Sequence, residues 1–389
     1  MTQLLQKHIK HFLVFIGFIL LSVAYFSPIL QGKKILQSDI VQHSGMAKQH
    51  IDFRASNDAE TYWTNSAFGG MPTYQLGANY PHNYIKKLDL ALRFLPRPAD
   101  YLFLYFLGFY ILLLVFGQDF RVAVLGALAF GFSTYFIIIL GVGHNAKAHA
   151  IAYMPFVLSG ILLVFQKRYL LGFVLTTIAS GLEIVTNHPQ MTYYLLFVIL
   201  FLGFSYCIKA HRDKEISSFL KSTVVLCCAA ILAVGMNATN LLATSEYAKE
   251  STRSQSELSI LPDGTLRPQT TGLDKEYITE YSYGILESFN LLIPRFMGGG
   301  SYEELDKDSE TYQAYKAMGA TALQAQNEIK RAPMYWGEQP IVEAPAYVGI
   351  VIIFLFLLAL ILYKGQHRWW LISALILSLL LSFGKNLSV

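Results

Sequence analysis

Long apolar stretches recur along the whole chain, and most of them are separated only by short polar joints. Several approach the roughly 20 residues that an α-helix needs to cross a bilayer. With 54% hydrophobic and 14% charged residues, the chain is far too apolar for a soluble domain of its length. The sequence therefore predicts an all-α polytopic membrane protein with about nine transmembrane helices. The predicted spans are residues 11–30, 101–117, 121–141, 150–166, 169–186, 190–208, 218–238, 346–363 and 369–383.

Basic residues orient these spans, because cytoplasmic joints carry an excess of lysine and arginine. The short joints on one side carry Lys7, Lys10, Arg121, Lys167, Arg168, Lys209, Arg212, Lys214, Lys364 and Arg368, and those on the other side carry little beyond Lys147. This predicts a cytoplasmic N-terminus and two large extracytoplasmic loops. The predicted regions are 1–30 (N-terminus and first span), 31–100 (first loop), 101–238 (spans two to seven), 239–345 (second loop) and 346–389 (spans eight and nine).

Composition also bounds the partners. The formal net charge of +4 is small and gives no indication of nucleic-acid binding. The first apolar run lacks a small-residue cleavage signal, so we interpret it as a retained anchor rather than a signal peptide.

Asp39 opens the first large polar loop, directly after the first span. A carboxylate just outside the bilayer can act as a general base toward an acceptor hydroxyl while it stays hydrated. The alternative is a helix N-cap or a solvated loop acid, because Ser38 and Asp39 are both good capping residues. Asp52, Asp58 and Glu60 share the loop and compete for the catalytic role.

A joint on the same predicted face holds His144, Lys147 and His149 within six residues. Positive charge and hydrogen-bond donors suit a phosphate or pyrophosphate headgroup, on which charge develops as it leaves. A metal site is a weaker interpretation, because no acidic third ligand lies at helical spacing. The third alternative is polar capping of two helices at the interface. A divalent metal is therefore left open, and no cofactor is predicted.

Other polar residues are expected on this outer face. Glu183 lies in apolar sequence one turn before the joint that contains His188, and both are candidates for substrate binding. An ionisable residue at membrane depth is a functional candidate by default. The alternative for Glu183 is a buried hydrogen-bond partner. In the second loop the candidates for phosphate contact are Arg253 and Arg295, and those for sugar contact are Trp336 and Glu338. Aromatic residues also anchor membrane interfaces, so the sugar interpretation has a structural alternative.

Two loop segments have helical patterns. Residues 83–95 place Ile85, Leu88, Leu92 and Leu95 on one stripe, with Lys86, Lys87, Asp89 and Arg93 off it. This predicts a helix that lies in the membrane interface, or alternatively a soluble helix packed on the other loop. The charged segment 302–331 is predicted as one exposed helix.

The order of several short motifs resembles the YfhO family of bacterial multi-span membrane proteins. The resembling stretches are Ser38-Asp39-Ile40, Tyr62-Trp63, Phe68-Gly69-Gly70-Met71-Pro72-Thr73-Tyr74, Gly143-His144 through His149, Asn187-His188 through Tyr194, Leu292-Ile293-Pro294, Gly298-Gly299, Tyr335-Trp336-Gly337-Glu338-Gln339-Pro340 and Pro345-Ala346-Tyr347. The resemblance spans nearly the whole chain. Members usually run longer, so we expect this sequence to be the N-terminal portion of a longer chain.

That family is similar to GT-C glycosyltransferases, which use polyprenyl-phosphate-linked sugars outside the cytoplasm and place an essential acid in the first outer loop. The resemblance implies a GT-C-like fold, Asp39 as the catalytic residue, a polyprenyl-phosphate-linked sugar as donor, and an envelope glycopolymer, lipid or protein as acceptor. It also implies a bacterial inner (cytoplasmic) membrane enzyme that is active on the extracytoplasmic face. The alternatives are a transporter or flippase for lipid-linked saccharides, and a non-catalytic scaffold for envelope assembly. Internal repeats, broken helices and charges near span midpoints would favour the transporter.

Overall fold

The computed structural model describes residues 2–251, 254, 260, 264–266 and 273–387, and it divides the chain into two compact units. Unit 1 comprises Met1–Phe132 and Ile139–Gly272, and unit 2 comprises Ser133–Ile138 and Leu273–Val389. The described chain is mostly helical, and its one sheet consists of two short strands.

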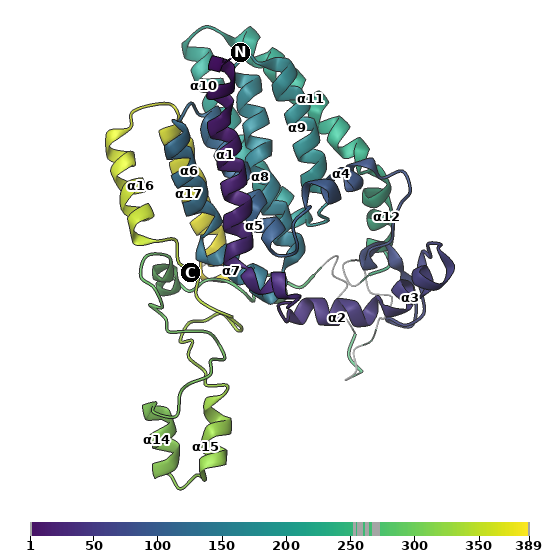
Figure 1. Ribbon diagram of the computed structural model, residues 1–389, viewed down its shortest axis with the longest axis vertical. Coiled ribbons are helices and arrows are strands. Elements are labelled where there is room, and N and C mark those ends of the chain that lie inside the picture. Colours follow the sequence, from purple (N-terminus) through teal and green to yellow (C-terminus); the bar gives the residue numbers. More distant parts are fainter. Residues whose placement is uncertain (1, 252–253, 255–259, 261–263, 267–272, 388–389) are drawn as a thin grey trace. The chain divides into compact units, whose positions relative to one another are not determined.

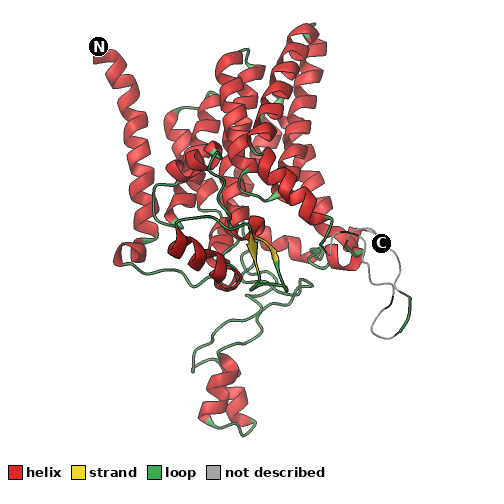
Figure 2. Cartoon of the chain, turned by 90° about the vertical axis from the view of Figure 1, so that its right-hand side faces the viewer, coloured by secondary structure: helices red, strands yellow, loops and turns green. Residues whose placement is uncertain are grey.

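Unit 1 is built from long apolar helices and several shorter ones. Its helices are α1 (Thr2–Tyr25), α2 (Ser38–Met46), α3 (Lys48–Asn57), α4 (Tyr84–Leu92), α5 (Ala99–Val115), α6 (Phe120–Gly131), α7 (Thr134–Val142, shared with unit 2), α8 (Asn145–Phe165), α9 (Tyr169–Ile184), α10 (Pro189–Arg212), α11 (Ile216–Met236) and α12 (Ala238–Ala248). The 3₁₀ turns are η1 (Ser27–Gln31) and η2 (Thr73–Leu76), and strands β1 (Trp63–Thr64) and β2 (Met71–Pro72) pair antiparallel. Figure 2 shows the long helices side by side, with these strands in the first loop.

Helix α8 is the centre of unit 1, because it contacts α5, α9, α10 and α11 (Figure 1) and most of its side chains are buried. It lies close to α9 at Gly160, where a Cβ atom would lie 2.6 Å from the backbone nitrogen of Thr176. Small residues allow helix backbones to come this close, as is common between membrane helices.

Five described helices are long and apolar enough to cross a membrane, or six if one bent pair counts as a single span. Three more apolar helices, α5, α9 and α16 (Ile350–Leu362), are shorter than 18 residues. The prediction of several membrane-spanning helices is thus confirmed in its general form, whereas the number nine is not. The first predicted span, 11–30, extends past the end of α1 at Tyr25, because Pro28 lies in the 3₁₀ turn that follows and disfavours helical backbone before it.

The predicted span 121–141 is not one straight helix. It consists of α6 and α7, which meet at a 44° bend after Gly131. Helix α7 then leads directly to Gly143 and the N-terminus of α8. A break of this kind in an apolar segment is either a broken span or a re-entrant segment.

Unit 2 contains the second large loop from Leu273 onward and the last apolar helices. Its elements are α13 (Lys275–Ile278), η3 (Leu286–Leu291), α14 (Glu310–Ala317), α15 (Ala322–Ile329), α16, α17 (His367–Phe383) and η4 (Gly384–Leu387). The predicted single helix over 302–331 is wrong, because α14 and α15 form two helices separated by Gly319 at a positive φ of 91°. Helix α15 begins at a capping box, in which the side chains of Thr321 and Gln324 each accept a hydrogen bond from the other's backbone amide.

Candidate functional site

The start of the first loop is attached to the segment before α8. Gln37 is buried, and its side-chain amide donates to the Leu140 carbonyl oxygen at 2.5 Å. The Asn145 amide donates to Gln37 Oε1 at 3.3 Å. Gly143 has a φ of +97° and no room for a side chain, because a Cβ atom would lie 2.8 Å from Cβ of Gln37. These contacts join two segments that are more than a hundred residues apart in the sequence. They fix the position of the first turn of α2, which begins at Ser38.

Asp39 lies in that turn, within the first turn of α2. Its Oδ2 atom is 3.4 Å from Nε2 of His144, and both side chains are about half exposed. The helix N-terminus favours a carboxylate there. The N-cap residue is Gln37, and no side chain caps the helix through a hydrogen bond. The alternative that Ser38 or Asp39 serves as the N-cap is therefore wrong, and the Asp39 carboxylate points toward the His144 joint.

Lys147 and His188 complete this cluster. Burial lowers the pKa of the His144 imidazole, the charge of Lys147 lowers it further, and Asp39 acts in the opposite direction. Burial also lowers the pKa of His188, and Lys147 and His144 add to that effect. Tyr194 and Asp39 interact electrostatically with Lys147. Both imidazoles favour their neutral form. The positive charge for a phosphate therefore comes from Lys147, and not from the histidines as expected.

The three acidic residues that compete with Asp39 for the catalytic role lie in other surroundings. Asp52 pairs with Lys48 across one exposed helical turn at 2.7 Å. Glu60 lies 3.3 Å from His50 and accepts a hydrogen bond from the backbone of Asn79. Asp58 is the C-cap of α3, at a positive φ of 46°. Among these four acids, Asp39 is the one for which the structure gives contact with the 143–149 segment.

His149 faces the interior of unit 1, unlike His144. Only 4% of its surface is exposed, and its Nε2 atom lies 2.5 Å from Oδ1 of Asp89 in α4. Asp89 is fully buried, and it also accepts hydrogen bonds from Arg93 at 3.1 Å, Lys86 at 3.0 Å and the Tyr153 hydroxyl at 3.0 Å. His149 was predicted to contact the donor phosphate, and the structure instead gives it a structural partner in the first loop.

Helix α4 buries a polar residue that lies off its apolar stripe. Its buried residues are Ile85 and Asp89, which are one turn apart, whereas 38% of Leu88 is exposed. The helix packs on α9, and its place in a membrane interface stays a prediction. Burial alone would raise the pKa of the Asp89 carboxyl, but the contact with His149, the charge of Lys86 and the hydrogen bond from Arg93 outweigh burial and hold that pKa well below its usual range.

Glu183 is 1% exposed and accepts hydrogen bonds from the Thr192 hydroxyl, at 2.9 and 3.0 Å to its two oxygens. Thr192 lies in α10, so the pair joins α9 to α10 across the joint that contains His188. This arrangement matches the alternative of a buried hydrogen-bond partner, and the predicted role in substrate binding stays a prediction.

Three of the four candidates in the second loop, Arg295, Trp336 and Glu338, belong to unit 2. Arg295 forms a 2.7 Å ion pair with Glu303, 75% of Trp336 is exposed, and Glu338 accepts a hydrogen bond from Asn386 at 3.0 Å. Arg253 lies outside the described residues. Sequence reasoning missed Glu287, which is 1% exposed and accepts hydrogen bonds from the Tyr335 hydroxyl and from the backbone amides of Gly284 and Gln339. These contacts fix the 335–339 segment.

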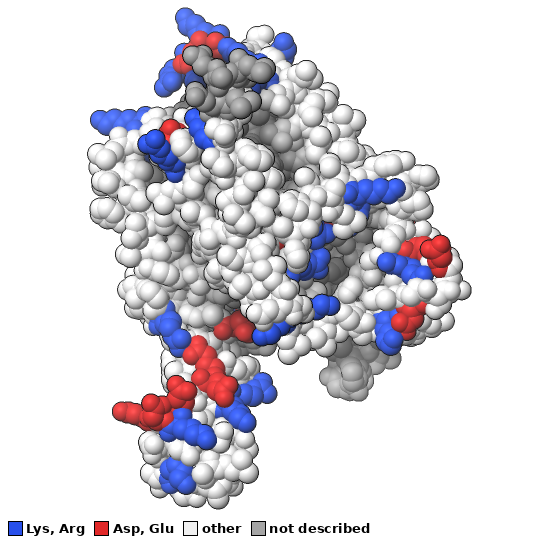
Figure 3. Space-filling model, viewed as in Figure 1, with Lys and Arg blue, Asp and Glu red and all other residues white. Residues whose placement is uncertain are grey.

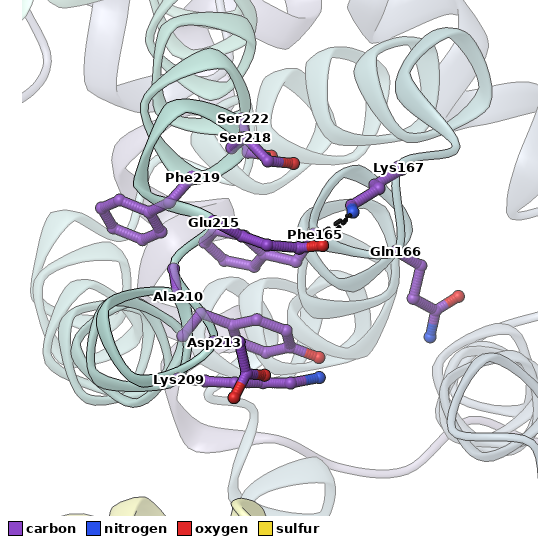
Figure 4. A pocket seen from close by; sticks show the side chains of 11 residues that line it. Phe165, Gln166, Lys167, Lys209, Ala210, Asp213, Glu215, Ser218, Phe219 and Ser222 are labelled. Carbon is purple, nitrogen blue, oxygen red and sulfur yellow. Dashed lines mark hydrogen bonds and ion pairs between the residues drawn. The ribbon is translucent and has the colours of Figure 1, made fainter.

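A different pocket lies at the opposite end of α8 from the Asp39 cluster (Figure 4). It has a volume of about 200 Å³ and is bordered by the end of α10 and the start of α11. Lys167 and Glu215 form an ion pair there at 2.9 Å, and the rings of Phe165 and Tyr206 stack 4.3 Å apart. Because its principal charges already pair with each other, we treat this pocket as a helix-packing corner.

Among the residues that the structure describes, no group of three or more His, Cys, Asp or Glu side chains has the arrangement of a metal site. The cluster around Asp39 contains one carboxylate and two imidazoles, but only the Asp39–His144 contact is at ion-pair distance. We therefore assign it no metal.

Comparison of the chain with protein-family models, curated proteins and solved structures finds no match. The resemblance to the YfhO family and to GT-C enzymes consequently stays a prediction.

Proposed function

We propose that this protein is a membrane glycosyltransferase that moves a sugar from a polyprenyl-phosphate donor to an acceptor of the bacterial cell envelope. The observation that supports the proposal is the cluster formed by Asp39, His144, Lys147 and His188. Three separate segments contribute to it, and each lies at the end or the beginning of an apolar helix or just beyond one. A cluster in this position can act on a substrate whose lipid tail stays in the bilayer.

The proposed reaction is a single displacement. Asp39 accepts the proton of an acceptor hydroxyl, and the oxygen forms a bond to the anomeric carbon of the sugar. The bond from that carbon to the phosphate oxygen breaks, and the electron pair leaves with the lipid phosphate. Lys147 stabilises the charge that develops on the leaving group, while neutral His144 orients Asp39. One displacement inverts the anomeric centre.

The polar contacts of the cluster indicate separate roles for its members. His144 lies within 3.4 Å of the carboxylate and can donate a hydrogen bond that fixes its orientation. Because both imidazoles favour the neutral form, Lys147 is the member of the cluster that contacts the phosphate charge in this proposal. Removing a general base lowers the rate by about 10²–10⁴-fold.

The test is transfer of labelled sugar from a polyprenyl-phosphate donor in membranes that contain wild type, Asp39→Asn or Asp52→Asn. Both variants convert one loop carboxylate to an amide, but Asp52 is exposed and pairs only with Lys48. We expect transfer to fall at least 100-fold in Asp39→Asn and to persist in Asp52→Asn at equal expression, with an inverted anomeric product. Equal transfer by Asp39→Asn and wild type would refute Asp39 as the base.

A transporter for lipid-linked saccharides is the second candidate, and one observation favours it. The α6–α7 pair is bent by 44° and leads directly into the 143–149 segment, and discontinuous helices often line transport sites. Translocation of a labelled lipid-linked saccharide across proteoliposomes, with no covalent transfer, would favour this candidate over the enzyme.

A further inference from the structure

A second basic site lies beside the Asp39 segment in unit 1. An open cavity of about 560 Å³ is bordered by the residues that follow α1 and those that precede α5. Its cationic lining residues are Lys33, Lys34, Arg93 and Arg97. A volume of this size is typical of small-molecule sites. Gln37 and Ile40 also line it, so the cavity adjoins the turn that carries Asp39.

The charge in this cavity is not balanced by its own walls. Its lining has four basic residues and one acidic residue, Asp100. Arg93 already pairs with Asp89 and Asp100 at 3.1 and 3.3 Å. Arg97 interacts electrostatically with Asp100 and lies over the Tyr101 ring at 5.5 Å. Within the described part of the chain, Lys33 and Lys34 have no carboxylate at ion-pair distance. These two lysines give the cavity an excess of positive charge, which favours an anion.

The surroundings of the cavity indicate a lipid rather than a soluble anion. Exposed apolar side chains flank the cations: Leu30 is 69% exposed, Leu36 86% and Phe94 55%. Basic residues interleaved with exposed apolar ones are typical of segments that contact a membrane surface with anionic headgroups. Figure 3 shows basic side chains on the surface between the end of α1 and α4. Two segments line the cavity. One follows α1, which is a candidate span, and the other leads into the apolar helix α5.

We infer that the cavity lined by Lys33, Lys34 and Arg97 binds the phosphate group of a membrane lipid whose headgroup carries a net negative charge. The apolar side chains at its rim contact the lipid tail, and the cations contact the phosphate. This site is separate from the Lys147 cluster, and it does not depend on glycosyl transfer. A phosphate on a lipid occurs in bulk anionic phospholipids and in polyprenyl phosphate, so the experiment includes both.

The test measures lipid binding to the purified full chain by native mass spectrometry, with phosphatidylglycerol, undecaprenyl phosphate and zwitterionic phosphatidylcholine as probes. The variant is Lys33→Gln/Lys34→Gln, and Lys33→Arg/Lys34→Arg keeps the charge. The control, Lys48→Gln/Lys87→Gln, removes two exposed cations of the same loop that do not line the cavity. Melting curves confirm that all variants fold, which is expected because Lys33 and Lys34 are exposed.

We expect the double glutamine variant to bind phosphatidylglycerol or undecaprenyl phosphate about 10- to 30-fold more weakly than wild type. Binding is retained in the arginine variant and in the control, and phosphatidylcholine binding does not change. Weaker binding of both anionic lipids supports a site for lipid phosphates in general. Weaker binding of only one of them supports the site and identifies which lipid it binds. Unchanged binding of both lipids in the glutamine variant, or equal loss in the control, would overturn the inference.

Discussion

The buried carboxylate of Asp89 offers the sharpest test of what holds the first loop on the helices. Asp89 has no exposed surface, and it contacts Lys86, Arg93, His149 and Tyr153. Replacing it by Asn keeps the size of the side chain and removes the charge that these groups share. Tyr153 and His149 come from α8, so the change removes a link between α4 and the centre of unit 1.

The magnitude follows from which partners are buried. Removing one member of a buried ion pair costs about 3–5 kcal/mol, because the other charge is left unpaired. The Arg93 side chain is 7% exposed but keeps Asp100 at 3.3 Å, and the Lys86 side chain is 39% exposed and can turn to water. We therefore expect Asp89→Asn to lower the free energy of unfolding by about 3 kcal/mol, at the lower end of that range.

The assay is unfolding of the purified chain in a mild detergent, followed by intrinsic tryptophan fluorescence. Asp52→Asn is the matched control, since its pair with Lys48 is exposed on both sides and contributes less than about 1 kcal/mol. If Asp89→Asn and Asp52→Asn destabilise the protein equally, the buried network does not anchor α4 and the reasoning is refuted.

Three further outcomes follow from the same structure. The folded-state pKa of Asp89 is depressed. Its contribution to stability is therefore complete above the unfolded-state pKa of about 4 and is lost as pH falls further. Acid unfolding curves of wild type should show a loss of stability below that pH that curves of Asp89→Asn lack. Gly143 has a φ of +97°, and a new Cβ there would lie 2.8 Å from Gln37. We expect Gly143→Ala to lower the free energy of unfolding by about 1–2 kcal/mol for the positive φ alone. Gly141→Ala, where nothing lies within 4 Å of a new Cβ, is its control in melting measurements. Glu183→Gln keeps an acceptor for Thr192 and should leave both melting and transfer within about threefold of wild type; a tenfold fall in transfer at unchanged melting would place Glu183 in the chemistry.

Periodicity and hydropathy were sufficient for the helical class and for the main polar joints. Apolar runs such as those of α8, α10 and α11 form helices in the structure, because an apolar segment can bury its backbone polar groups only by pairing them internally. The ends were less predictable. Tyr25 ends α1 earlier than expected, and the bend after Gly131 divides one predicted span into two helices.

The burial of Asp89 was the part that local pattern did not predict. The sequence pattern placed Asp89 off the apolar stripe of α4, whereas the structure buries this carboxylate completely. A sequence pattern assumes that buried partners are apolar, and α8 instead presents the polar groups of His149 and Tyr153 to this helix. No signal within α4 itself could have indicated those partners.

By itself, the sequence determined that the chain is mainly helical, with several apolar helices long enough to cross a membrane, and that its polar residues gather in a few joints and two long loops. Only the tertiary structure decided which of those residues meet. It brought Asp39 to His144 and Lys147 through the contacts of Gln37 and Gly143, and it turned His149 away toward Asp89. The physical reason is that hydropathy is a property of each segment alone, whereas a site depends on which distant segment lies beside it.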